Sequence, residues 1–111
     1  MRNLFLYGPP GSGKSTLGKL LAERLDLPFL DLDKIVQNDA GMPVRRIFAE
    51  EGESGFRTRE KRALEVVCER SGCVVALGGG TLLDDACRAM AEHGGTVVCL
   101  ECPLDVLRAH I

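Results

Sequence analysis

The feature that most constrains this chain is residues 8–15, which read Gly-Pro-Pro-Gly-Ser-Gly-Lys-Ser. This stretch fits the pattern G-x-x-x-x-G-K-[ST] completely, and Thr16 follows it. An apolar run over residues 3–7 precedes the loop, and leucines at helical spacing follow it over residues 14–25. A strand, a glycine-rich loop and a helix form the context in which this pattern binds phosphate. A chance glycine and proline turn between a strand and a helix is the disfavoured alternative.

The loop carries the residue types that nucleotide phosphates require. Its glycines let backbone N–H groups turn inward toward phosphate oxygens, and the N-terminus of the next helix adds its dipole. Lys14 would reach the β- and γ-phosphates, and the Ser15 hydroxyl would ligate the Mg²⁺ that bridges them. The predicted nucleotide-binding residues are Gly11, Ser12, Gly13, Lys14, Ser15 and Thr16.

The rest of the chain alternates apolar runs with helical stretches. Further strands are predicted over residues 28–32, 73–77 and 96–100. Helices are predicted from Lys34, over residues 44–51, 55–70 and 84–92, and from about Pro103. Strands that alternate with helices pair in parallel through right-handed crossovers. The expected fold class is therefore α/β, with an open parallel sheet between two layers of helices.

Composition excludes several other classes of protein. Sixteen acidic and 14 basic side chains give a net charge of −2, which disfavours nucleic acid as a partner. No apolar stretch approaches the roughly 20 residues that cross a bilayer, and residues 3–7 lack the features of a signal peptide. We therefore expect a single cytoplasmic domain over residues 1–111, with neither nucleic acid nor a membrane as its partner.

The five cysteines do not suit a disulfide framework, so we expect reduced thiols. Cys99 and Cys102 form a C-x-x-C pair, a spacing that also serves zinc and redox sites. No second pair and no histidine at ligand spacing accompanies them in the sequence. A small buried side chain on a strand with a nearby thiol is therefore the favoured interpretation.

Two more clusters follow predicted strands, at the sheet edge where α/β proteins bind ligands. One is Gly-Gly-Gly at residues 78–80, and the other is the pair Asp31 and Asp33. On a strand, a spacing of two puts both carboxylates on one side. One could then hold Mg²⁺ through water while the other takes the proton of an acceptor hydroxyl. For each aspartate the alternative is a solvated position in a turn or a helix cap, and Asp33 could cap the helix from Lys34.

A strongly charged run covers residues 51–62 and has four cations within its last six positions. An arginine that points into the site could form a bidentate pair with a substrate carboxylate, and Arg57 is the candidate. For Arg59, Lys61 and Arg62 we favour a solvated helix face with ion pairs at spacings of three and four.

Taken together, these pieces resemble the shikimate kinases, which are P-loop kinases of small metabolites. The matching motifs are the glycine-rich loop, Asp-Leu-Asp at 31–33, Glu-Gly-Glu-x-x-Phe-Arg at 51–57 and Gly-Gly-Gly at 78–80, in this order. The resemblance covers the chain from Asn3 onward. It implies transfer of the γ-phosphoryl group of ATP to the 3-hydroxyl of shikimate, with Mg²⁺, by a monomeric enzyme.

The resemblance also implies roles for residues of the acceptor site. Asp33 looks like the carboxylate that binds the shikimate hydroxyls and acts as a base. Arg57 looks like one of the arginines that hold the shikimate carboxylate, and Glu60 like a support for Arg57. Gly79 and Gly80 look like the backbone that lets the ring approach closely, which is a steric role suited to glycine.

On the nucleotide side, Asp31 resembles the carboxylate that organises Mg²⁺ together with Ser15. Lys14 resembles the phosphate-binding lysine, so Lys14 and Asp33 are the predicted catalytic residues.

The sequence stops at Ile111, inside a predicted helix, whereas the family continues. The family's lid arginine, second carboxylate-binding arginine, adenine contacts and fifth strand would follow. Without them, the charge that develops in the transition state would be poorly stabilised. Residues 96–100 would also form an exposed sheet edge. The chain is then either part of a longer kinase or a shortened protein that binds nucleotide or shikimate without turnover. A related kinase, such as one for gluconate, is a further alternative that the Glu-Gly-Glu-x-x-Phe-Arg and Gly-Gly-Gly motifs argue against.

Overall fold

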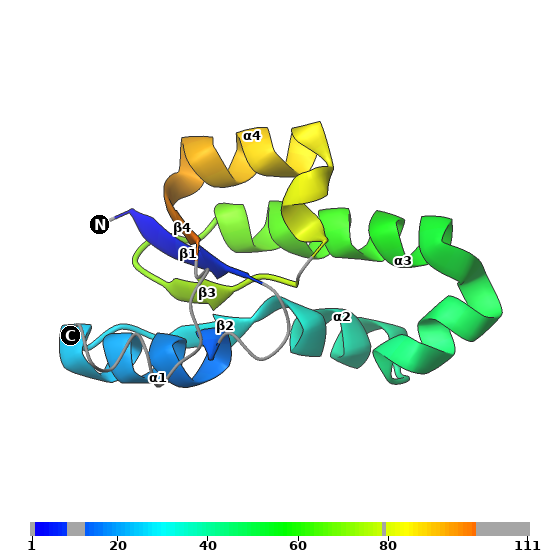
Figure 1. Cartoon of the computed structure of the whole chain (residues 1–111), viewed down its shortest axis with the longest axis horizontal. Coiled ribbons are helices and arrows are strands. Elements are labelled where there is room, and N and C mark those ends of the chain that lie inside the picture. Colours follow the sequence, from blue (N-terminus) through cyan, green and yellow to red (C-terminus); the bar gives the residue numbers. More distant parts are fainter. Residues whose placement is uncertain (1, 9–12, 79, 100–111) are drawn as a thin grey trace.

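A computed structural model describes residues 2–8, 13–78 and 80–99 and contains one four-stranded sheet (Figure 1). The strands are β1 (Asn3–Tyr7), β2 (Phe29–Asp31), β3 (Val74–Ala76) and β4 (Gly95–Cys99). They pair in parallel in the order β2-β3-β1-β4. The predicted parallel α/β sheet is therefore confirmed.

The helices are α1 (Lys14–Leu25), α2 (Leu32–Ala40), α3 (Val44–Cys68) and α4 (Asp85–Gly94), with a 3₁₀ turn η1 (Thr81–Leu83) before α4. α3 joins the two helices predicted over residues 44–51 and 55–70, ends two residues before the predicted end, and bends between them at Gly52. Gly52 has φ 73° and ψ 180°, a conformation that is almost confined to glycine. The helix predicted from Pro103 lies outside the described residues.

The sheet lies between two helical layers because neighbouring strand residues point to opposite faces. Phe5 of β1 belongs to a large apolar cluster with Leu64 of α3 and Ala91 of α4. The next residue, Leu6, belongs to a separate cluster with Ala22 of α1. Figure 1 shows the same division, with α1 on one side of the sheet and α3 and α4 on the other. The expected three-layer arrangement is confirmed.

α2 and the part of α3 that contains the bend extend beyond the sheet at one end of the molecule (Figure 1). Leu32 and Val36 of α2 are fully buried, and they share the large apolar cluster with Ile47 and Phe56 of α3. We call this projecting unit, residues 32–60, the arm. Its packing carries the charged residues of α3 to the edge at which the strands end.

Among residues 2–8, 13–78 and 80–99, no helix is both long and apolar enough to cross a membrane. The described cysteines are Cys68, Cys73, Cys87 and Cys99, and none forms a disulfide with another described residue. Cys99 is exposed, so the burial expected for it is wrong. The reason is that Cys99 is the last residue of β4, which lies at an edge of the described sheet. Cys102 lies outside the described residues.

Candidate active site

Within the described residues, the Lys14 side chain connects the two ends of the phosphate loop. Gly13 immediately precedes α1 with φ 82°, in the left-handed region that favours glycine. Lys14 then donates from Nζ to the carbonyl oxygen of Gly8, at 3.1 Å. Ser15 and Thr16 lie in the first turn of α1, where backbone N–H groups lack partners within the helix. Gly11 and Ser12 lie outside the described residues.

Asp31 has a different local role from the one its spacing suggests. β2 ends at Asp31, whose Oδ1 accepts hydrogen bonds from the backbone N–H groups of Asp33 at 3.1 Å and Lys34 at 3.4 Å. Asp31 is therefore the N-cap of α2, which begins at Leu32. Asp33 consequently lies in the first helical turn, so the prediction that both carboxylates lie on one side of a strand is wrong. The helix-cap alternative is therefore confirmed for Asp31, whereas the version in which Asp33 caps a helix from Lys34 is wrong.

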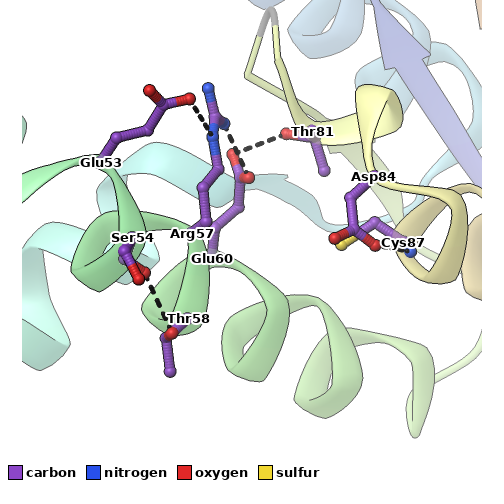
Figure 2. Close-up of polar contacts among 8 residues, drawn as sticks. All are labelled: Glu53, Ser54, Arg57, Thr58, Glu60, Thr81, Asp84 and Cys87. Carbon is purple, nitrogen blue, oxygen red and sulfur yellow. Dashed lines mark hydrogen bonds and ion pairs between the residues drawn. The ribbon is translucent and has the colours of Figure 1, made fainter.

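A buried carboxylate on α3 orients Arg57 (Figure 2). The Glu60 residue is 1% exposed, and its Oε1 accepts a hydrogen bond from Arg57 Nη1 at 2.9 Å. The second oxygen, Oε2, accepts one from Thr81 Oγ1 at 2.8 Å. Arg57 also has its Nε 3.8 Å from Glu53 Oε1 and its Cζ 5.3 Å from the centre of the Phe56 ring. Glu60 therefore supports Arg57, as expected, and both of its oxygens have partners, as a buried carboxylate requires.

Gly80 leaves the space that the Arg57 guanidinium occupies. A Cβ atom on Gly80 would lie 2.9 Å from Arg57 Cζ and closer still to Nη2. Gly80 has a negative φ of −104°, so its requirement is for space rather than for an unusual backbone conformation. Gly79 lies outside the described residues.

Gly78 leaves space for the carboxylates of Asp33 and Glu60, as Gly80 does for Arg57. A Cβ atom on Gly78 would lie 3.0 Å from Asp33 Oδ1 and 3.4 Å from both Glu60 Oε2 and Thr81 Oγ1. The side chains of α2, α3 and η1 therefore meet over the backbone of this glycine. Sequence reasoning assigned no role to Gly78 itself, although the Gly-Gly-Gly motif pointed to this segment.

Charges from both sides of the site act on Asp33. Its pKa lies above the usual value, chiefly because burial disfavours the charged carboxylate, and the negative charges of Asp31 and Glu60 add to this effect. The positive charges of Lys14 and Arg57 act in the opposite direction. The predicted phosphate-binding lysine and the predicted substrate-binding arginine therefore both lie within electrostatic reach of the predicted base.

Thr81 is the site residue that sequence reasoning missed. It is fully buried and donates its hydroxyl hydrogen to Glu60, which lies 21 positions away in the sequence. A single threonine carries no sequence signal of such a role. Its place directly after Gly-Gly-Gly was the only available indication.

Arg59 forms the ion pairs expected of a solvated helix face, but at a different spacing. Its Nε and Nη2 donate to the two carboxylate oxygens of Glu51 at 2.8 and 2.9 Å, and its Nη1 donates to Asp39 at 3.4 Å. Glu51 is eight residues away, a spacing that an uninterrupted helix would not bring together. The bend at Gly52 makes this contact possible.

The described residues contain no group of three or more His, Cys, Asp or Glu side chains that could hold a metal ion. Mg²⁺ with a nucleotide needs fewer protein ligands, because phosphates and water supply the other oxygens. Asp31 uses Oδ1 for the helix cap, and its other oxygen has no hydrogen-bond partner among the described residues. A carboxylate oxygen from Asp31 and the hydroxyl of Ser15 are the hard donors that Mg²⁺ prefers, so this pair fits the ion chemically.

Comparison with known proteins identifies relatives over almost the whole chain. A family model described as shikimate kinase matches residues 10–111. A shikimate kinase of Pseudomonas fluorescens is 47% identical over 105 residues, which cover 95% of this chain and 61% of that protein. A shikimate kinase of Rhodopirellula baltica is 47% identical over 110 residues, which cover 99% of this chain and 59% of that protein. The chain thus spans about 60% of the length of these curated relatives.

A solved structure shares the fold described above. The shikimate kinase of Acinetobacter baumannii in complex with shikimate superposes with a TM-score of 0.90 at 40% identity. The superposition covers 96% of this chain and 59% of that one. The P-loop kinase fold expected from the sequence is therefore confirmed.

Proposed function

Because the chain belongs to the shikimate kinase family, we propose that it forms the phosphate- and acceptor-binding part of an enzyme that phosphorylates shikimate with ATP. The reaction would yield shikimate 3-phosphate and ADP. The observation that carries the proposal is the meeting of Arg57 and Asp33 around Gly78 and Gly80. This arrangement combines a cation for a carboxylate with a base for a hydroxyl.

On the acceptor side, Arg57 would bind the carboxylate of shikimate. Glu60 engages Nη1, and no hydrogen bond among the described residues uses Nη2, so a donor remains for the substrate. Asp33 would accept a hydrogen bond from the 3-hydroxyl and take its proton as that oxygen bonds to the γ-phosphorus. The bond from the γ-phosphorus to the β,γ-bridging oxygen breaks, and ADP leaves. Gly79 and Gly80 would let the ring approach the backbone, with the Arg57 guanidinium in the space that a side chain on Gly80 would fill.

On the nucleotide side, the proposed ligands of the ATP phosphates are Gly11, Ser12, Gly13, Lys14, Ser15 and Thr16. Lys14 would exchange its hydrogen bond with the Gly8 carbonyl for contacts with the β- and γ-phosphates. Ser15 and Asp31 would hold Mg²⁺, Asp31 through water. When bound, the ion would offset the negative charge of the phosphates. We place this activity in the cytoplasm and in a monomeric protein.

The test is a coupled assay of ADP release with ATP and Mg²⁺, run on the protein at its natural length. Shikimate and gluconate are compared as acceptors, and calorimetry measures the binding of each. Release of ADP that depends on shikimate is the expected result. Release that depends on gluconate would favour the related-kinase alternative, and binding of shikimate without release would favour a binding module.

A further inference from the structure

Thr81 connects the glycine-rich segment after β3 to the arm. Its backbone N–H donates to the Gly78 carbonyl at 3.2 Å, which closes a turn over Gly80. Its side-chain hydroxyl donates to Glu60 Oε2 at 2.8 Å, and the residue has no exposed surface (Figure 2). One residue therefore fixes both the backbone that lies against Arg57 and the carboxylate that orients Arg57.

The Thr81 hydroxyl donates a hydrogen bond to one of the two oxygens of the Glu60 carboxylate, Oε2. Glu60 is 1% exposed, so water cannot readily replace a lost donor. Oε1 is already engaged by Arg57. Without the Thr81 hydroxyl, Oε2 would be a buried anionic oxygen without a donor among the described residues. The carboxylate would then have to rotate toward another hydrogen-bond donor. Rotation of Glu60 would move or release the Arg57 guanidinium.

We infer that Thr81 is a positioning residue for the acceptor substrate: its buried hydroxyl holds Glu60 in the orientation that directs Arg57 at the substrate carboxylate. This inference rests on the proposed function, because it assigns the carboxylate of shikimate to Arg57. Thr81 itself need not touch the substrate. A purely structural threonine would stabilise the fold without affecting how the site distinguishes a carboxylate from an uncharged group.

The test compares Thr81→Val, which keeps the branched shape without the hydroxyl, with Thr81→Ser, which keeps the hydroxyl. Calorimetry measures the Kd of shikimate, of its methyl ester and of the Mg²⁺ complex of ADP, using the protein at its natural length. Thr81→Val is expected to weaken shikimate binding about tenfold, on the scale of one hydrogen bond to a charged group, and to leave the Kd of the nucleotide within about twofold. Thr81→Ser is expected to restore most of the affinity.

The deciding readout is the ratio of the Kd of the methyl ester to the Kd of shikimate. Arg57 acts on the carboxylate, so Thr81→Val should lower this ratio by about the same tenfold. Thr58→Val is the matched control, because the Thr58 hydroxyl donates to the Ser54 carbonyl on an exposed part of α3 (Figure 2). It should change neither Kd nor the ratio.

Three results would overturn the inference. If wild-type protein binds shikimate and Thr81→Val changes the Kd of neither shikimate nor its ester, Thr81 has no positioning role although the proposed function survives. Equal weakening of acid and ester by Thr81→Val would show a structural role only. If wild-type protein does not bind shikimate, the proposed function fails and the substrate role of Thr81 fails with it. Should Thr81→Val not fold, Thr81→Ala also lacks the hydroxyl, and a wild-type ratio in that variant would overturn the inference equally.

Discussion

The two sides of the site are built by different means. On the phosphate side, the described contacts use the main chain: Lys14 donates to the Gly8 carbonyl, and Asp31 accepts from two backbone N–H groups of α2. On the acceptor side, Arg57, Glu60 and Thr81 contact one another through their side chains. The proposed phosphate side thus depends on local backbone conformation, whereas the proposed acceptor side depends on packing between segments that are distant in sequence.

Loss of the Lys14 ammonium should have the largest effect and should act on the phosphate side alone. We expect Lys14→Ala to lower kcat by about 10³-fold or more, because the transferred phosphoryl group loses a positive charge. Nucleotide affinity should fall, and the Kd of shikimate should stay within about twofold of wild type. Coupled assays and calorimetry measure these quantities. Lys19→Ala, on the exposed face of α1, is the control; a similar loss there, or normal turnover in Lys14→Ala, would contradict the assignment.

Asp33 lies where the two sides meet, so its loss should affect chemistry more than binding of either ligand. Asp33→Asn has the same shape but cannot take the proton of the 3-hydroxyl, and kcat should fall about 10²-fold. Steady-state kinetics should show a change in KM of only a few-fold. Asp26→Asn is the control, because it makes the same chemical change at the end of α1, away from the site. The left-handed conformation of Asp26 (φ 56°) suits asparagine. A near-normal rate for Asp33→Asn would reduce Asp33 to a positioning group.

Removal of Arg57 should separate the two sides most clearly. Arg57→Ala should raise the Kd of shikimate about 10- to 100-fold, because a charge-assisted pair with the carboxylate is lost. The Kd of the nucleotide should remain within about twofold. Arg57→Lys should restore only part of the affinity, since an ammonium cannot form the paired hydrogen bonds of a guanidinium. Arg62→Ala, which removes an exposed arginine of the same helix, is the control. Unchanged shikimate affinity in Arg57→Ala would refute its role.

An effect on stability, rather than on binding or turnover, is expected at the bend that carries Arg57 to the site. A Cβ atom on Gly52 or Gly41 would meet no atom within 4 Å, so any cost of an alanine comes from the backbone. Gly41 (φ 71°, ψ 22°) is left-handed, whereas Gly52 (φ 73°, ψ 180°) lies in a region that is almost confined to glycine. Gly52→Ala should therefore cost about 1–3 kcal/mol of unfolding free energy and Gly41→Ala about 1 kcal/mol.

Urea denaturation measures both costs. Asparagine sharpens the comparison because it adopts the left-handed conformation more readily than alanine. Gly41→Asn should be nearly neutral, whereas Gly52→Asn should remain destabilising. Equal costs at the two glycines would show that the bend of α3 relaxes easily, and the acceptor side would then be less rigid than its contacts indicate.

Much of the fold could be predicted from the sequence because its signals are local. The three later strands lie within one residue of their predicted positions, and the interruption between the two predicted helices contains Gly52. The position of Asp33 was harder to predict, because either aspartate of Asp-Leu-Asp could have capped the following helix. Only the folded chain shows that Asp31 does so, and this moves Asp33 from the strand to the helix.

The acceptor side shows where sequence reasoning stops. The resemblance suggested Glu60 as a support for Arg57, and a spacing of three does bring two side chains together on a helix. Its hydrogen bond to Thr81 depends on how α3 packs beside η1, and no spacing rule reports that distance. The roles assigned to Lys14, Asp33 and Arg57 in binding and catalysis remain predictions that the variants above address.

Arg59 should give the arm a sensitivity to ionic strength that the sheet does not share. Its guanidinium joins Glu51 before the bend and Asp39 of α2, and the side chain is about a quarter exposed, so dissolved ions can screen these pairs. Arg59 also lowers the pKa of Glu51, so their pairing persists to more acidic pH than an isolated glutamate would allow. Raising the salt concentration should therefore speed hydrogen exchange around Gly52 while leaving exchange in β1 and β3 unchanged. The mobility of the acceptor side would then depend on the salt concentration of the solvent, whereas the mobility of the core would depend only on the packing of its apolar side chains.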